Sequence, residues 1–238
     1  MKKLFDRLYN KSQVSFYDIM ESNLKKNKRM FIVTANPETF MMSENDDEMK
    51  KLLLDKETTL VPDGIGIVKA ARMIGYEVEE RITGIDIANK LLELGNVYKK
   101  SIYLFGSKKE VIDSMRDVLK EKYPNLKVAG AVDGYVNDRD KVFNDIKKVK
   151  PDIVLVALGI PYQEKLIYKH IKDFNKGIFV GVGGSFDVIS GHKKRAPKLF
   201  IKLNLEWLYR IMKEPKRLKR FYDSNVKFLF KVRKYKDK

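Results

Sequence analysis

Six short apolar runs recur along the chain, and each is typical of a β-strand. They cover residues 30–34, 59–61, 101–105, 127–132, 152–158 and 177–182. Most of them end at glycine or proline, residues that mark turns. The run from Ile153 to Leu158 has no alternation of apolar and polar residues, which indicates a parallel strand covered on both faces.

Helical patterns separate these runs. They cover residues 40–54, 65–74, 85–98, 109–122, 138–149 and 163–174. Strands that alternate with helices of this length form βαβ units, so the sequence predicts an α/β fold. We expect a Rossmann-like, doubly wound, mainly parallel sheet with helices on both faces, formed by residues 1–190. We expect residues 191–238 to form a basic, helical C-terminal appendage.

The charge of the 238-residue chain is concentrated in this appendage. Residues 191–238 hold 17 Lys and Arg against 4 Asp and Glu, whereas the rest of the chain holds 32 basic and 28 acidic residues. Apolar residues recur there at spacings near three and four: Leu199, Phe200, Leu203, Trp207, Leu208, Ile211 and Met212. A basic amphipathic segment of this kind binds a polyanion, either nucleic acid or an anionic membrane surface. The alternative is a helix that packs on the core, which the pattern favours less for Phe228 and Phe230 than for residues 199–212.

The composition excludes several classes of protein. The absence of cysteine excludes disulfides, thiolate nucleophiles and cysteine-ligated metal centres, and it favours a cytosolic location. The N-terminus has no apolar secretion signal, and no apolar run approaches the ~20 residues that span a bilayer. We therefore expect a soluble or peripheral protein. Neither a G-x-G-x-x-G turn after the first strand nor a Walker lysine turn occurs, which disfavours nicotinamide and P-loop enzymes.

Polar clusters follow the first two predicted strands. Thr34-Ala-Asn36 ends the first, Asp63 ends the second, and Arg81 lies a short distance further along the chain. Ligands of open parallel sheets bind outside the carboxyl ends of the strands, so these side chains should face one crevice. Asp63 is the candidate general base, because a carboxylate at such a strand end can take a proton from an attacking hydroxyl. A turn-forming aspartate before Gly64 is the alternative.

Glycines mark several strand-to-helix turns. Those that we expect to bind a nucleotide are Gly106, Gly159, Gly183 and Gly184. Glycine lets backbone amides approach an anion, and a helix N-terminus adds a partial positive charge, so such turns could cradle a pyrophosphate. At any single position the alternative is that the glycine only makes a tight turn.

The spelling Asp138-Arg-Asp140 matches the D-x-D motif that holds a divalent ion in metal-dependent transferases. It lies at a predicted helix start, so we interpret it as acid in the first turn that interacts with the helix dipole. His170 and His192 are too far apart in sequence for a local metal site. We assign no metal and no cofactor.

A series of motifs resembles a known family. In chain order they are T-A-N-P-E, P-D-G-I-G, R-I-T-G-I-D, Y-L-F-G-S, D-G-Y, A-L-G-I-P-Y-Q-E and V-G-G-S-F-D-V-I-S-G. From Thr34 to the appendage, the chain strongly resembles the WecG/TagA/CpsF glycosyltransferases, also called glycosyltransferase family 26. The resemblance implies transfer of a sugar from a UDP-sugar to a lipid-linked saccharide diphosphate at the cytoplasmic membrane face. The TagA branch, which is most similar, implies metal-independent, inverting transfer of N-acetylmannosamine to undecaprenyl-diphosphate-linked N-acetylglucosamine, which opens the wall teichoic acid linkage unit.

The resemblance also implies roles for individual residues. Asp63 matches the proposed base, Gln163 could bind the sugar or phosphate, and Tyr135 and Asp187 correspond to positions that contact the uridine. The arginines that would bind the diphosphate from the appendage are Arg210, Arg217 and Arg220. Members of the family self-associate, so a homo-oligomer is possible.

Three further residues fit this chemistry by their type. Thr34 and Asn36 could hydrogen-bond sugar hydroxyls, although Asn36 before Pro37 could equally cap a helix. Arg81 offers a planar donor fork suited to a diphosphate. A salt bridge from Arg81 to Asp86 or Glu79 is the alternative.

Other functions stay open at this point. The same fold could use another UDP-sugar donor, such as N-acetylmannosaminuronic acid or glucose, to build a capsule or exopolysaccharide. A nucleic-acid-binding α/β protein would also explain the basic appendage, but no recognised nucleic-acid-binding motif occurs.

Overall fold

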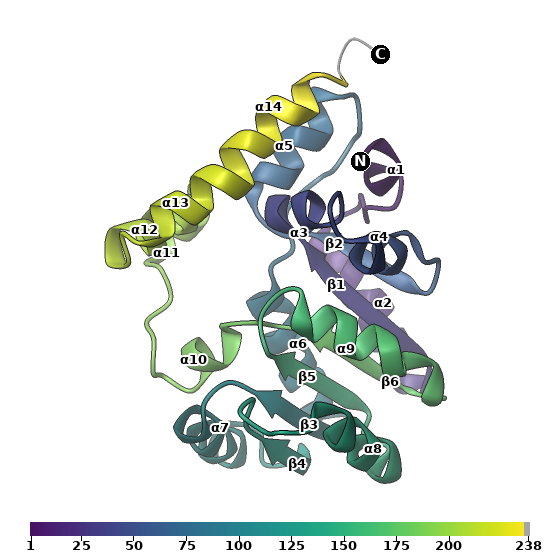
Figure 1. The fold of residues 1–238 in the computed structure, drawn as a ribbon. Coiled ribbons are helices and arrows are strands. Elements are labelled where there is room, and N and C mark those ends of the chain that lie inside the picture. The colour runs from purple at the N-terminus through teal and green to yellow at the C-terminus, as the bar shows by residue number, and fades with distance from the viewer. Residues whose placement is uncertain (236–238) are drawn as a thin grey trace.

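The six predicted strands form one sheet in the computed structural model, which describes residues 1–235 (Figure 1). The strands are β1 (Arg29–Ala35), β2 (Thr58–Pro62), β3 (Ser101–Gly106), β4 (Lys127–Val132), β5 (Ile153–Ala157) and β6 (Gly177–Gly181). Their order is β2-β1-β6-β5-β3-β4, and every neighbouring pair is parallel. Because β6 and β5 separate β1 from β3, the sheet is doubly wound, as predicted.

Helices cover both faces of the sheet and enclose two hydrophobic cores. On one face lie α1 (Lys2–Phe5), α3 (Pro37–Met42), α4 (Asp47–Leu54), α5 (Ile65–Met73), α8 (Arg139–Val149), α9 (Tyr162–His170) and α14 (Lys227–Arg233). On the other lie α2 (Gln13–Lys25), α6 (Gly84–Val97), α7 (Lys109–Lys122) and α10 (Ser185–Ile189). In β5, Val154 and Val156 face the first core while Ile153 and Leu155 face the second. This two-sided burial explains why the β5 sequence does not alternate.

Two features at the N-terminal side differ from the sequence prediction. The predicted helix 40–54 is two helices, because Asn36 caps α3 and Asp46 caps α4, each through its side-chain oxygen. The α2 helix was missed. Its signals are the Ser12 cap, whose Oγ accepts from the Ser15 N–H, and buried residues four apart, beginning with Phe16 and Met20.

The predicted helix 163–174 ends early. It forms α9 and then a 3₁₀ turn, η1 (Ile171–Asp173). The remaining predicted helices agree with the structure within a residue or two.

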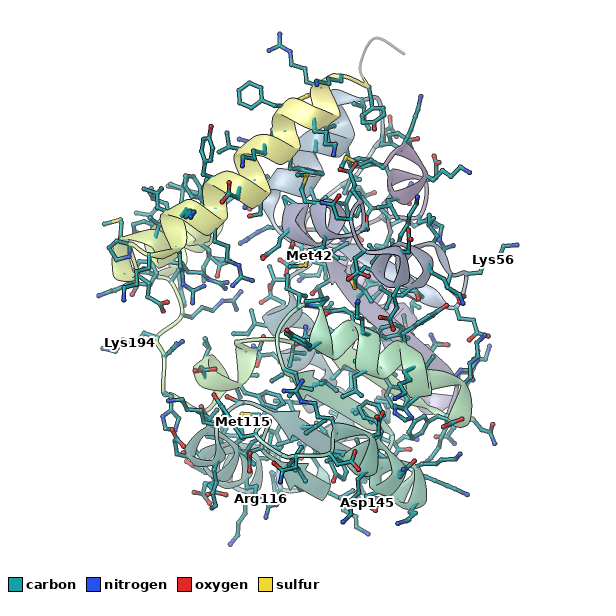
Figure 2. All side chains as sticks on the ribbon, viewed as in Figure 1. Met42, Lys56, Met115, Arg116, Asp145 and Lys194 are labelled. Atoms are coloured by element: carbon teal, nitrogen blue, oxygen red, sulfur yellow. The ribbon has the colours of Figure 1, made fainter. Side chains whose placement is uncertain are left out.

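Between residues 191 and 235 the appendage forms four short helices and a π-helical turn. They are α11 (Lys198–Lys202), α12 (Glu206–Lys213), α13 (Arg217–Phe221), η2 (Tyr222–Val226) and α14. In Figure 1, α12 and α13 stand away from the sheet, whereas α14 lies beside α5. The connection from α10 to α11 carries Lys194, whose side chain is exposed (Figure 2).

The two ends of the appendage have opposite surroundings. Phe228 on α14 is fully buried, with its ring centroid 6.3 Å from that of Phe5 and 6.0 Å from that of Phe40. The expectation that Phe228 is less suited to the core than residues 199–212 was therefore wrong. Leu199 and Met212 are instead about two-thirds exposed, at 64% and 65%.

Among residues 1–235, no helix is both long enough and apolar enough to span a bilayer.

Candidate active site

The carboxyl ends of β1 and β2 meet at Asp63. In the parallel register Ala35 lies opposite Pro62, and the Asp63 N–H donates to the Ala35 carbonyl oxygen at 2.8 Å. The Ile82 N–H donates to the Pro62 carbonyl oxygen at 2.8 Å. These bonds fix the segment that carries Arg81 against the end of β2, so the structure brings together two of the predicted site residues.

The N-terminus of α6 closes against the same strand ends. Thr83 caps this helix, and a Cβ atom on Gly84 would lie 3.6 Å from Thr34 Cγ2 and 3.9 Å from Val182 Cα. The Gly84 N–H lies close enough to the Asp63 carboxylate to lower its pKa. Thr34, Asp63 and the start of α6 therefore form one cluster, which the end of β6 completes.

The electrostatics of Asp63 suit a base that works near neutral pH. The residue is half-buried, and its carboxyl group lies deep among protein groups. Burial raises the pKa of Asp63 to about 6, although Arg210, the Gly84 N–H and Arg81 act against that rise. The negative charge of Glu206 adds to it. A carboxyl group with this pKa is mostly ionised above pH 6 and remains basic enough to accept a proton.

Arg81 pairs with the appendage. Its Nη1 lies 2.9 Å from Glu206 Oε2, and its Nη2 donates to the Ile201 carbonyl oxygen at 3.3 Å. The salt bridge to Asp86 or Glu79 considered from the sequence is not formed, because Asp86 pairs instead with Arg195, whose Nη2 lies 2.8 Å from Asp86 Oδ1. The Arg81 guanidinium group is thus held by a residue far away in the sequence.

Asn36 caps α3, as one of the two sequence interpretations had it. Its Oδ1 accepts from the Thr39 N–H at 3.0 Å and from the Thr39 hydroxyl at 3.0 Å, and the Asn36 N–H donates to Thr39 Oγ1. A role of Asn36 in binding sugar hydroxyls stays a prediction.

Gln163 joins two strand-end loops. Its Oε1 accepts from the Gly159 N–H after β5 and from the Gly183 N–H after β6, both at 3.1 Å. Its Nε2 donates to Glu164 Oε1 at 2.7 Å. The Gln163 side chain is 3% exposed, and the structure gives both ends of its amide protein partners. Its predicted contact with sugar or phosphate is not tested by these bonds.

Glu164 is a buried carboxyl group that the sequence did not single out. It is 1% exposed, and its Oε2 has no hydrogen-bond partner among the described residues. Burial raises the pKa of Glu164 to about 7, while the bond from Gln163 acts in the opposite direction.

The predicted nucleotide-binding residues lie along the loops after β3 to β6. Gly106 has φ +120°, and a Cβ atom at this position would clash with the Ala157 backbone. The close approach of the two strands therefore requires glycine here. Tyr135 is exposed in the loop after β4, and Asp187 on α10 is half-buried with Lys193 Nζ 3.6 Å from its Oδ1. Nothing would contact an added Cβ on Gly159, Gly183 or Gly184, so these turns have open space beside them, although the N–H groups of Gly159 and Gly183 already donate to Gln163.

The three appendage arginines have different partners. The charge of Arg210 acts on Asp63, which places this arginine near the base. Arg217 Nε donates to Glu214 Oε2 at 2.8 Å within the appendage, and Arg220 forms two bonds to Glu38 on α3.

The D-x-D spelling has a structural explanation. Asp138 caps α8 by accepting from the Lys141 N–H at 3.0 Å, and Asp140 in the first turn pairs with Lys169 and His170. Across residues 1–235, no three His, Asp or Glu side chains gather into a group that could hold a metal ion.

The sequence also missed Glu206 and Arg195, which lie beside the site. Glu206 had a signal, since it is one of only four acidic residues in the basic appendage and stands between Leu205 and Trp207. It is 6% exposed, and a carboxylate buried to that degree requires a cationic partner.

Known proteins of similar sequence identify the family of this chain. The B. subtilis strain 168 N-acetylglucosaminyldiphosphoundecaprenol N-acetyl-beta-D-mannosaminyltransferase is 42% identical over 212 residues, covering 89% of this chain and 82% of that protein. The protein of the same name from S. aureus strain MW2 is 36% identical over 210 residues, covering 88% and 82%. Residues 5–238 match the family described as "Glycosyl transferase WecG/TagA/CpsF family". The chain belongs to this glycosyltransferase family, as its motifs had indicated.

Proposed function

We propose that this protein moves N-acetylmannosamine from UDP-N-acetylmannosamine to undecaprenyl-diphosphate-linked N-acetylglucosamine, with inversion at the anomeric carbon. Membership of the family supports sugar transfer, and the names of the B. subtilis and S. aureus relatives state the sugar and the acceptor. The product would open the linkage unit of wall teichoic acid.

One observation carries the proposed chemistry. A half-buried carboxyl group, Asp63, stands at the carboxyl end of the sheet within reach of the charges of Arg81 and Arg210. Asp63 would accept the proton of the attacking hydroxyl while the hydroxyl oxygen bonds to the anomeric carbon. The bond from that carbon to the phosphate oxygen breaks, and UDP leaves with the electron pair.

The leaving diphosphate develops negative charge, which preorganised cations stabilise. Arg81 and Arg210 are the proposed cations, because their charges already act on Asp63. Arg217 and Arg220 would join them only by exchanging their bonds to Glu214 and Glu38 for bonds to the diphosphate. We propose Thr34 and Gln163 as contacts to the sugars, and Tyr135, Asp187 and the open glycine turns as contacts to the nucleotide.

In this proposal arginines take the place of a divalent ion. The transfer should therefore continue in the presence of EDTA. A rate that collapses on chelation and returns with added Mg²⁺ or Mn²⁺ would contradict this part of the proposal.

The acceptor is a lipid, so we propose that the enzyme works as a peripheral protein on the inner face of the cell membrane. The appendage supports this, because it exposes apolar side chains among many cations. The exposed ones include Leu199, Leu203, Trp207, Met212 and Leu218. Anionic headgroups contribute about 1 kcal/mol per nearby Lys or Arg.

The experiment compares several UDP-sugars as donors. It is incubated with a synthetic lipid-diphosphate-N-acetylglucosamine and one UDP-sugar at a time, and the product mass is measured. We expect mass addition of one N-acetylhexosamine with UDP-N-acetylmannosamine. Faster transfer from UDP-glucose or UDP-N-acetylmannosaminuronic acid would indicate another donor, and no transfer from any donor would overturn the proposal.

A further inference from the structure

Glu206 links the appendage to the crevice through a chain of alternating charges. Its Oε2 lies 2.9 Å from Arg81 Nη1, and its Oε1 lies 3.6 Å from Arg195 Nε. Arg195 Nη2 in turn lies 2.8 Å from Asp86 Oδ1, and the other oxygen of Asp86 accepts from the Thr83 hydroxyl at the start of α6. The four charged groups come from α6, the segment before it, the α10–α11 connection and α12.

Glu206 and Arg81 are largely buried, so breaking their salt bridge is costly. The Glu206 side chain is 8% exposed and that of Arg81 15% exposed. Removing one partner of such a pair leaves the other as an uncompensated charge in a poorly solvated place, which is far more costly than losing a surface pair. Arg81 thus depends on Glu206 for its position as long as no anionic ligand is present.

The charges of this pair act on the proposed base. The groups that act on Asp63 are Arg81, Arg210, Glu206 and the Gly84 N–H. Two of them, Arg210 and Glu206, belong to α12. Docking of this helix therefore places a cation and an anion where both act on Asp63. Because α12 is anchored by Glu206, the position of Arg210 depends on the same salt bridge.

We propose that Glu206 is a positioning residue of the transfer reaction, which enters the site from the appendage and holds Arg81 and α12 beside Asp63. Glu206 would not touch the reacting atoms. Its pairing with Arg81 and Arg195 makes the docked appendage part of the catalytic arrangement. This inference rests on the proposed function for its kinetic test, but the salt bridge itself can be tested without activity.

The kinetic test compares Glu206→Gln with wild type on a detergent-solubilised acceptor. We expect kcat to fall about tenfold to a hundredfold, the effect of misplacing catalytic groups. The acidic limb of the pH profile of kcat/KM should move to higher pH, because the displaced Arg81 and Arg210 lower the pKa of Asp63 more than Glu206 raises it. Glu206→Asp should recover part of kcat, since it keeps the charge.

The matched control is Asp223→Asn. It removes an appendage carboxylate whose side chain is 46% exposed and whose ion pair among residues 1–235 is with Lys227, on the same helical stretch. It should leave kcat and the pH profile unchanged. The proposal is overturned when Glu206→Gln keeps the wild-type kcat and pH profile, or when Asp223→Asn lowers kcat equally.

A double-mutant cycle tests the salt bridge when the wild type shows no transfer. Urea unfolding is measured for wild type, Arg81→Gln, Glu206→Gln and the double variant. We expect a coupling of at least about threefold in the unfolding equilibrium constant. Additive effects would overturn the inference, whereas absence of transfer together with this coupling would overturn only the proposed function.

Discussion

Arg220 donates to both carboxylate oxygens of Glu38, from Nε to Oε1 at 2.8 Å and from Nη2 to Oε2 at 3.0 Å. Glu38 lies in the first turn of α3, two residues after Asn36. Lys231 pairs with Glu44 just beyond the same helix. Two salt bridges thus fasten the second half of the appendage to the region that follows β1.

Glu38→Gln should loosen this attachment. A salt bridge between exposed side chains contributes about 0–1 kcal/mol to the free energy of unfolding, and a bidentate arginine–carboxylate pair belongs at the upper end of that range. We expect amide hydrogen exchange in residues 217–226 to accelerate a few-fold, while exchange in α2 stays unchanged. Asp223→Asn is the control, because its pair with Lys227 does not cross to α3. Equal exchange in Glu38→Gln and wild type would show that the bond does not fasten the appendage.

Phe228 and Phe230 offer a comparison of core and surface on one helix. Phe228 is fully buried against Phe5 and Phe40, whereas Phe230 is 66% exposed. Phe228→Ala should lower the free energy of unfolding by about 3–5 kcal/mol because it leaves a cavity. Phe230→Ala should change it by less than about 0.5 kcal/mol. Urea unfolding measures both, and equal losses would contradict the placement of α14.

The sequence alone predicted the sheet but not which aromatic residue of α14 enters the core. The strands were predictable because each is a local apolar run ended by a turn residue, and β5 revealed its two covered faces by lacking alternation. Phe228 and Phe230 share the same local surroundings of lysines. What separates them is contact with Phe5 and Phe40, which lie at the other end of the chain and leave no local signal.

The candidate site also contains residues that the sequence predicted and contacts that it did not. Asp63 and Thr34 were predictable because parallel strands bring their ends to one edge. The partner of Arg81 was not, because a salt bridge to Glu206 depends on how the appendage docks, whereas spacing suggested only the neighbours Asp86 and Glu79. The capping of α3 by Asn36 was one of two compatible local interpretations, and the structure confirms it, while the role of Asn36 in binding sugar hydroxyls stays a prediction.

The pKa of Asp63 predicts how its replacement affects stability. Its pKa is raised to about 6 from an ordinary value of 3.8, so the folded state favours the protonated form. The stabilisation from this group is fully present below pH 3.8 and is lost as the pH rises through about 6. Asp63→Asn should therefore gain stability relative to wild type between pH 5 and pH 8, by up to about 1–3 kcal/mol. Thermal unfolding across this pH range measures the difference in stability between the variant and wild type. A gain that shrinks with rising pH would contradict the raised pKa of Asp63.

Gln163→Ala should destabilise the loops after β5 and β6. It removes the acceptor of the Gly159 and Gly183 N–H groups and the donor to the buried Glu164. Unpaired buried polar groups cost about 1–3 kcal/mol each, so we expect a loss of about 2–4 kcal/mol in urea unfolding at pH 7. A variant that unfolds like wild type would show that these bonds do not hold the loops.

Glu164→Gln is the companion variant, because it keeps an acceptor for Gln163 and removes the titrating group. The pKa of Glu164 is raised to about 7, so the stabilisation from its protonated form is lost as the pH rises through about 7. The variant should be more stable than wild type at pH 8, and the advantage should shrink toward pH 5. An advantage that is larger at pH 5 than at pH 8 would contradict the raised pKa.

The central claim is that Asp63 removes the proton of the attacking hydroxyl. Its most direct measurement is the initial rate of N-acetylmannosamine transfer by wild type and Asp63→Asn, from pH 5 to pH 8.5, on the same lipid-linked acceptor. We predict that the wild-type rate rises with an apparent pKa near 6 and that Asp63→Asn loses about 10²–10⁴-fold at pH 7.5 while remaining folded. A folded Asp63→Asn enzyme with the wild-type rate and pH profile would contradict it.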